Sequence, residues 1–141
     1  MLRVLIVTAA ALLFSTNMLG QEKQKMSISF HCQCDDQVGR QYATYFRDAL
    51  AQSPRYEEAH SDQTKDLNGK VTSAVFVVSI VSVDESSTNP GKSSSFSLVL
   101  TLGGDSFISQ YVQNCGINAV KNCASDGLSF VDGKIQGWLG S

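Results

Sequence analysis

The hydrophobic pattern of this 141-residue chain changes its period several times, and each change marks a new structural element. Residues 26–34 alternate between apolar and polar side chains, which indicates a strand with one buried face. Across residues 37–53 the apolar side chains recur every three or four positions, which predicts a helix with one buried face. Pro54 ends that helix, because the residue before a proline avoids helical backbone angles. The folded part of the chain therefore begins with a strand and a helix.

Three further strands follow. Residues 73–83 are apolar on both faces, which suits a strand covered on both sides or one that twists from one environment into another. Residues 84–92 are rich in turn residues and predict a hairpin connection. Residues 95–102 alternate strictly, as one face of a half-buried strand requires. After a glycine-rich turn, a fourth strand is expected from residue 107 to about residue 113.

The last element is a helix, because apolar residues keep helical spacing from residue 117 to residue 138. Residues 57–70 have no period and indicate a loop, with a short strand beginning at Tyr56 as an alternative. The order strand, helix, strand, strand, strand, helix predicts an α+β fold. We expect a four-stranded mixed, mostly antiparallel sheet (β-α-β-β-β-α) with two helices packed on one face.

The amino-terminal 20 residues have the three parts of a signal peptide. Arg3 precedes an apolar run over residues 4–14, and a short polar stretch leads to expected cleavage after Gly20. The run is shorter than the roughly 20 residues that span a bilayer, so no stable membrane span is expected after cleavage. An uncleaved anchor or a buried helix is the alternative. Residues 21–141 then form a single exported domain, periplasmic or extracellular.

Four cysteines are expected to meet at one end of this domain. A right-handed crossover after the first strand brings the ends of strands one and four together, with Cys32 and Cys34 on one and Cys115 on the other. An exported protein favours disulfides, and neither Cys pair has the spacing of a zinc knuckle, so no metal site is expected. Cys115 with Cys123 is the preferred bridge. For Cys32 and Cys34 the alternatives are a strained second bridge that acts as a redox pair, two buried thiols, or disulfides to the other cysteines.

The remaining ionisable residues do not indicate catalysis. Asp35 and Asp36 precede the first helix and are interpreted as caps for its free N–H groups, with calcium binding or catalysis as the alternative. His60 lies in the polar loop, and strand alternation turns His31 away from Cys32 and Cys34. No nucleophile is paired with a base, so we expect no enzyme activity and no cofactor.

The charge of the chain argues against nucleic acid as a partner. Eleven Lys and Arg face 13 Asp and Glu, which gives a formal net charge of −2. The basic residues are scattered, so no stripe exists that would neutralise a row of phosphates. Nucleic-acid binding is therefore not expected.

Four stretches carry a resemblance to a known family: RQYATYFRDALAQSPRY, then the hairpin strands SAVFVVSIVSV and SSFSLVLTL, then DGKIQGWLG. Their order resembles the N-terminal domain of the TolB family and, more loosely, outer-membrane assembly factors of the CsgG kind. The resemblance covers most of residues 27–140, and the β-propeller repeats of TolB do not follow. It implies a non-catalytic envelope module that binds another protein, and it assigns no individual residue.

A candidate partner surface lies on the strand over residues 95–102. Its outward side chains are uncharged and lightly apolar, and they are Ser95, Ser97, Val99 and Thr101. Such a face can dock an envelope protein or a second copy of the chain, or it can be ordinary solvent-facing sheet. We expect an exported non-catalytic domain that serves as a protein-binding or assembly module of the cell envelope. The alternative is a thiol-disulfide or metal-handling protein that uses Cys32 and Cys34.

Overall fold

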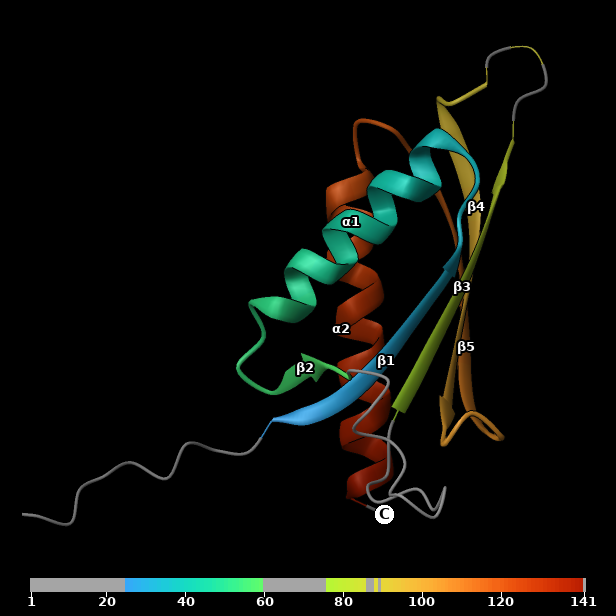
Figure 1. The fold of residues 1–141 in the computed structure, drawn as a ribbon. Coiled ribbons are helices and arrows are strands. Elements are labelled where there is room, and N and C mark those ends of the chain that lie inside the picture. The colour runs from blue at the N-terminus through green and yellow to red at the C-terminus, as the bar shows by residue number, and fades with distance from the viewer. Residues whose placement is uncertain (1–24, 60–75, 86–87, 89, 141) are drawn as a thin grey trace, which may run out of the picture.

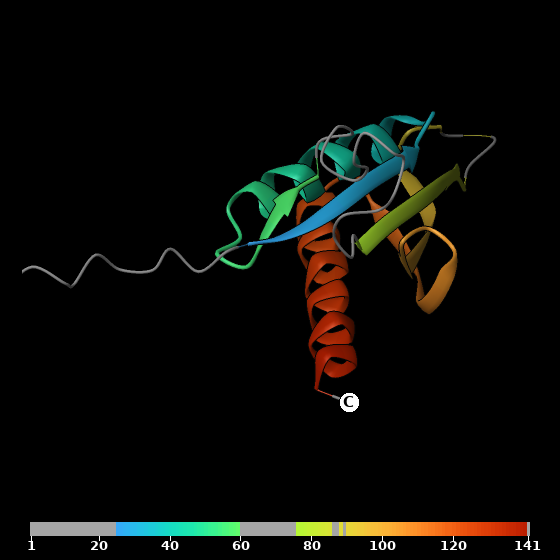
Figure 2. The same ribbon diagram turned by 60° about the horizontal axis from the view of Figure 1, so that its bottom comes forward.

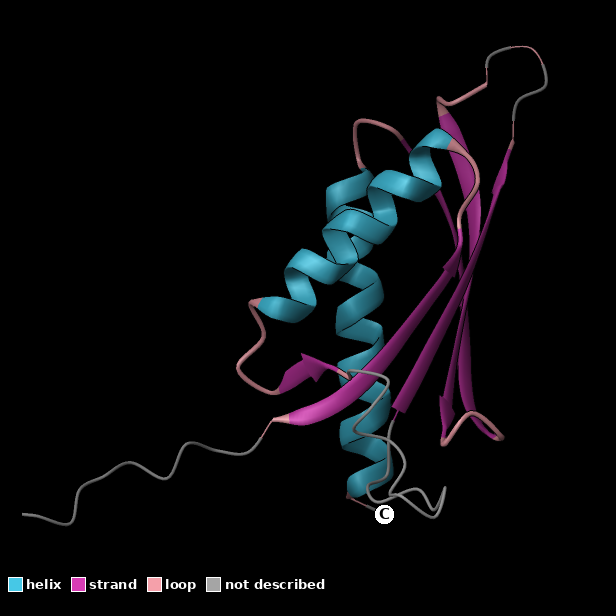
Figure 3. Ribbon diagram, in the orientation of Figure 1, coloured by secondary structure: helices cyan, strands magenta, loops and turns pink. Residues whose placement is uncertain are grey.

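The computed structural model describes residues 25–59, 76–85, 88 and 90–140 of the chain. They form an α+β fold in which two helices pack against one sheet (Figures 1 and 3). The elements in chain order are β1 (Met26–Gln33), α1 (Gln37–Ala51), β2 (Tyr56–Glu58), β3 (Phe76–Asp84), β4 (Ser93–Leu102), β5 (Ser106–Gly116) and α2 (Val120–Leu139).

The sheet has five strands in the order β2-β1-β3-β4-β5, so the expected number of four is wrong by one. The additional strand, β2, pairs in parallel with β1 from Tyr56 opposite Met26 to Glu58 opposite Ile28. β1 is also parallel to β3, whereas β4 is antiparallel to both β3 and β5. Two pairings of each kind make the sheet mixed, and the two antiparallel pairings are the longer ones.

β2 was predicted only as an alternative because its three residues are too short to show a period. Its backbone is nevertheless held firmly against β1: Met26 N–H donates to the Arg55 carbonyl at 2.8 Å, and Ala59 N–H donates to the Ile28 carbonyl at 2.7 Å. Glu57 and Glu58, which the sequence placed in the loop, belong to this strand. The rest of that loop from residue 60 lies outside the described residues, as do residues 73–75 of the predicted second strand.

Both helices cover the same face of the sheet, as predicted; in Figure 2 α1 and the upper turns of α2 lie behind β1. Alternate residues of three strands point into this face, because successive side chains of a strand alternate between faces. The buried apolar residues of these three strands are Ile28 and Phe30 of β1, Phe76, Val78 and Ile80 of β3, and Phe96, Leu98 and Leu100 of β4. The helices bury against them Val38, Tyr42, Phe46 and Leu50 of α1, and Val120, Ala124, Val131 and Ile135 of α2. We call this side of the sheet the covered face.

Asp36 immediately precedes α1, and its carboxylate caps the helix as predicted, whereas the Asp35 carboxylate, also predicted as a cap, makes no capping bond in the described structure. The Asp36 carboxylate accepts a hydrogen bond from Gly39 N–H at 2.7 Å, from the buried Ser94 hydroxyl at 2.6 Å, and from the Ser82 hydroxyl. Burial by itself raises the pKa of Asp36, but these three hydrogen bonds together outweigh burial and hold the pKa below its ordinary value. The cap therefore ties the start of α1 to β3 and β4.

The two helices approach each other closely at Gly127 of α2. A Cβ at this position would overlap the hydroxyl of Tyr42, so only glycine fits. Tyr42 stacks on Phe96 with ring centroids 4.4 Å apart, and its hydroxyl accepts from the Gln113 amide at 3.0 Å. The same amide nitrogen donates to the Cys123 carbonyl at 3.1 Å, so β5, α1 and α2 share one polar junction.

Candidate functional site

The side of the sheet opposite the helices carries no helix of the described chain, and its surface is the candidate site. We call the outward side chains of β3, β4 and β5 the open face. Not one of them is ionisable, and the apolar and polar ones are mixed. They are Val77, Ser79, Val81 and Val83 of β3, Ser95, Ser97, Val99 and Thr101 of β4, and Phe107, Gln110, Val112 and Asn114 of β5.

The strand register sets which of these side chains are neighbours. Ser97 lies between Val81 on β3 and Val112 on β5, and Val99 lies between Ser79 and Gln110. Four of the six apolar members of the open face are exposed: Val81 is 43% exposed, Val83 62%, Phe107 65% and Val112 62%, while Val77 and Val99 are half-buried. The four exposed side chains are therefore available to a partner and contribute little to the core.

Four of the six polar side chains of the open face form hydrogen bonds with one another or with Glu85, which lies just after β3. The Ser95 hydroxyl contacts Glu85 at 2.6 Å and Asn114 at 3.1 Å, and the Gln110 amide donates to the Ser97 hydroxyl at 3.3 Å. Because these groups have partners within the protein, covering them costs less free energy than burying unpaired polar groups would.

The structure thus brings together the four β4 residues that the sequence singled out. The wider surface was not predicted from the sequence, above all Val81, Val83, Phe107 and Val112. The signal is present in β3, whose residues are apolar on both faces, but this pattern predicts a strand covered on both sides or one that twists between environments. Cover on both sides is wrong: within the described residues, helices cover β3 on one side only, and its outward valines lie on the open face, where Val81 and Val83 near its end are exposed.

The cysteines form two pairs at disulfide distance. Cys115 of β5 is bonded to Cys123 of α2 with Cα atoms 6.4 Å apart, which is the connectivity preferred from the sequence. Cys32 is bonded to Cys34 with Cα atoms 5.3 Å apart, so neither pairs with the other two cysteines. Among the described residues, no group of three or more His, Cys, Asp or Glu side chains could hold a metal ion.

The Cys32–Cys34 pair borders a pocket of about 600 Å³ at the end of β1. Phe30, His31 and Arg47 also line it, and the Arg47 guanidinium lies 4.9 Å from the centre of the Phe30 ring. His31 contacts the Ser29 hydroxyl at 3.1 Å on the outward side of β1. The other histidine, His60, lies outside the described residues.

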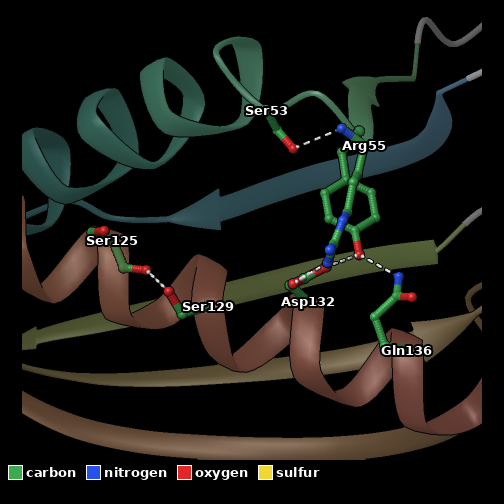
Figure 4. A network of polar contacts seen from close by, with 7 residues as sticks. Ser53, Arg55, Ser125, Ser129, Asp132 and Gln136 are labelled. Carbon is green, nitrogen blue, oxygen red and sulfur yellow. Dashed lines mark hydrogen bonds and ion pairs between the residues drawn. The ribbon is translucent and has the colours of Figure 1, made fainter. Parts of the chain in front are cut away.

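A second polar cluster joins β2 to α2 (Figure 4). Arg55 donates to both oxygens of Asp132, at 2.9 and 2.7 Å, and the Tyr56 hydroxyl donates to the same carboxylate at 2.5 Å. The Gln136 amide donates to the Tyr56 hydroxyl at 3.4 Å. The sequence did not predict this cluster, because Tyr56 and Asp132 are 76 positions apart.

The charge states in this cluster follow from those contacts. Burial raises the pKa of Tyr56 to about 12, helped by its hydrogen bond to the Asp132 carboxylate. Burial also raises the pKa of Asp132, but the hydrogen bonds from Tyr56 and Arg55 and the Arg55 charge outweigh it, so that pKa is below its ordinary value. A neutral phenol and a paired carboxylate suit a structural tie between β2 and α2.

In the described part of the chain, neither helix is long and apolar enough to cross a membrane. No protein-family model matches the chain, and no curated protein matches it. Among solved structures it is similar to TolB from Acinetobacter baumannii, with a TM-score of 0.52 and 10% sequence identity. The similarity covers 75% of this chain and 28% of that one. At this identity the similarity shows a TolB-like fold alone, and no comparison supports the likeness to the CsgG kind.

Proposed function

We propose that the chain is an exported, non-catalytic module of the cell envelope and that the open face of its sheet docks another protein. The observation that carries the proposal is a sheet face without ionisable groups on which Val83, Phe107 and Val112 are each more than 60% exposed. A single exposed apolar residue is ordinary, but several within one register indicate contact with a partner.

The chemistry of the open face agrees with a protein partner. Removing water from valine and phenylalanine side chains is favourable, while Ser95, Ser97, Gln110 and Asn114 keep their partners within the protein. The absence of charge avoids the cost of desolvating an ion on binding. The TolB-like fold and the two disulfides support an exported location for such a module.

The test places a charge in the centre of the open face. Val99→Lys should keep the fold, because the residue is only half-buried, and should abolish recovery of the partner from envelope extracts. Ala51→Lys is the matched control, since Ala51 is exposed at the end of α1, away from the sheet. Equal recovery of the same proteins by wild type and both variants would refute docking on this face.

A second function is favoured by a specific observation: Cys32 of the Cys32–Cys34 disulfide lines the pocket of about 600 Å³ at the end of β1. In thiol–disulfide exchange, a dithiol substrate would reduce this bond. The substrate would be oxidised to a disulfide, and its two electrons and two protons would pass to Cys32 and Cys34, which would become thiols. Thiol titration under mild reductant separates the two functions. A redox protein releases the thiols of Cys32 and Cys34 while folded, whereas a docking module with purely structural bridges releases none until it unfolds.

A further inference from the structure

The two edges of the sheet differ in a way that determines how the chain can pair with another strand. At one edge, β2 has only three residues, and two of them are glutamates. Glu58 pairs with Arg47 at 3.3 Å, and Glu57 accepts from the Ser27 hydroxyl at 3.3 Å. Short length and charge are the features by which proteins prevent an edge strand from pairing with a neighbouring molecule.

The opposite edge, β5, has none of these features. Its eleven residues, SFISQYVQNCG, include no charged residue and no proline. β5 pairs with β4 along its whole length, and no other described strand pairs with its far side. Figure 2 shows β2 and the β4–β5 hairpin at opposite sides of the sheet. The backbone groups on the far side of β5 are therefore available as a template for another strand.

Most of β5 has the regular geometry that such pairing needs. The register with β4 shifts between Leu100 and Thr101, which leaves Ile108 as an additional residue on β5. Beyond this bulge the register is continuous from Ser109 to Gly116. Eight residues of edge are long enough for a stable ladder, because typical strands are about five or six residues long.

We propose that β5 pairs antiparallel with β5 of a second copy of the chain, about a two-fold axis at Val112. This register uses the regular segment and places Val112 opposite Val112 of the other copy, with Gln110 opposite Asn114. A two-fold axis at the neighbouring residue, Gln113, is unsuitable, because the side-chain amide of Gln113 is held on the covered face by Tyr42 and Cys123. The pairing goes beyond the docking proposal, since it forms in the purified protein without any envelope partner.

A second copy suits this edge for two physical reasons. Antiparallel self-pairing places each strand against its own sequence, so a single charge near the axis would face a like charge; β5 has none. Each copy has one sheet, and within its described residues β5 is the only long uncharged edge. The β5–β5 contact uses this edge in both copies and leaves the short, charged β2 edges outermost. The assembly therefore closes as a dimer and does not continue into a fibre.

Sedimentation velocity on the purified chain, expressed in full, tests the pairing. Wild type should sediment with twice the mass of one chain. Val112→Lys and Val112→Glu should each sediment as monomers, because the substitution opposes like charges at the axis. Mixing the two variants should restore the dimer, because opposite charges then meet there. Val83→Lys is the matched control: Val83 is also 62% exposed on the open face but lies on central β3, so this variant should stay dimeric.

Restoration by mixing also shows that both Val112 variants are folded. A wild type that sediments as a single chain at the highest soluble concentration would overturn the pairing, even if an envelope protein binds β5 instead. A dimer that survives Val112→Lys would overturn it as well, and so would a mixture of the two charged variants that stays monomeric.

Discussion

The covered face and the open face of the sheet share the same strands yet differ in what their side chains do. In β4, Phe96, Leu98 and Leu100 are at most 1% exposed beneath the helices, while Ser97 and Val99 between them are half-buried on the other side. Removing a covered side chain leaves a cavity in a packed interior, whereas an open one already contacts water. Stability therefore resides in the covered face, and the apolar residues of the open face are free to serve binding.

The largest difference in stability expected from this contrast is between substitutions at two neighbouring residues of β4. Leu98→Ala should lower the free energy of unfolding by about 2–5 kcal/mol, because it empties a fully buried site. Val99→Ala should lower it by less than about 1 kcal/mol, the whole span of strand propensities. Urea unfolding of both variants measures the difference, and similar losses for the two would contradict the contrast between the faces.

The Cys115–Cys123 bridge belongs to the covered face, since Cys115 is 3% exposed and links β5 to α2. Cys115→Ser should destabilise the protein by about 2–4 kcal/mol and leave Cys123 reactive. Cys34→Ser is the matched control and should cost less, because the Cys32–Cys34 bridge closes a sequence separation of 2 residues instead of 8. Thermal unfolding measures both, and a larger cost for Cys34→Ser would reverse the expected order.

The Asp36 cap lies where α1 meets the covered face, and it should make stability depend on pH. Its pKa is lower in the folded state than in the unfolded chain, so its contribution is present above the ordinary value of 3.8 and is lost as pH falls through the folded value. Asp132 acts in the same direction. Asp36→Asn should cost about 1–2 kcal/mol at neutral pH and should flatten the acid limb of the stability curve.

Unfolding by urea between neutral and acidic pH measures this dependence. Asp35→Asn is the control, because Asp35 is exposed and its backbone carbonyl, not its carboxylate, accepts a hydrogen bond from Arg40. An acid limb that Asp36→Asn leaves as steep as in wild type would show that the cap does not act through its charge.

The smallest effect on stability is expected on the open face itself. Val99→Lys should change the free energy of unfolding by no more than about 0.5 kcal/mol, as is usual for surface substitutions. Chemical denaturation measures it alongside Ala51→Lys. A loss of several kcal/mol for Val99→Lys alone would mean that something within the chain covers the open face.

The sequence predicted those elements whose period is long enough to read. The alternation of β4 and the helical spacing of α1 were sufficient, because burial on one face imposes each pattern. β2 was predicted only as an alternative to a loop, because Tyr-Glu-Glu is too short to show a period and its place depends on backbone hydrogen bonds to β1. The hydrogen bond between Tyr56 and Asp132 was not predicted, because it joins residues far apart in the sequence.

The candidate site was predicted in part, for a related reason. Strict alternation identified the outward residues of β4, but the valines of β3 look the same whether a layer covers them or not. Only the placement of both helices on the other face shows that Val81 and Val83 are open. The extent of the open face is thus a property of the layers and not of any one strand.

Photo-crosslinking in the cells that make the protein tests the docking face most directly. A photoreactive residue at Val99 should give a discrete covalent adduct with an envelope protein, because a docked partner lies against the centre of the open face. The same residue at Ala51, exposed on α1, should give none. Equal adducts from both positions, or adducts from Ala51 alone, would contradict the assignment of the open face as the docking surface.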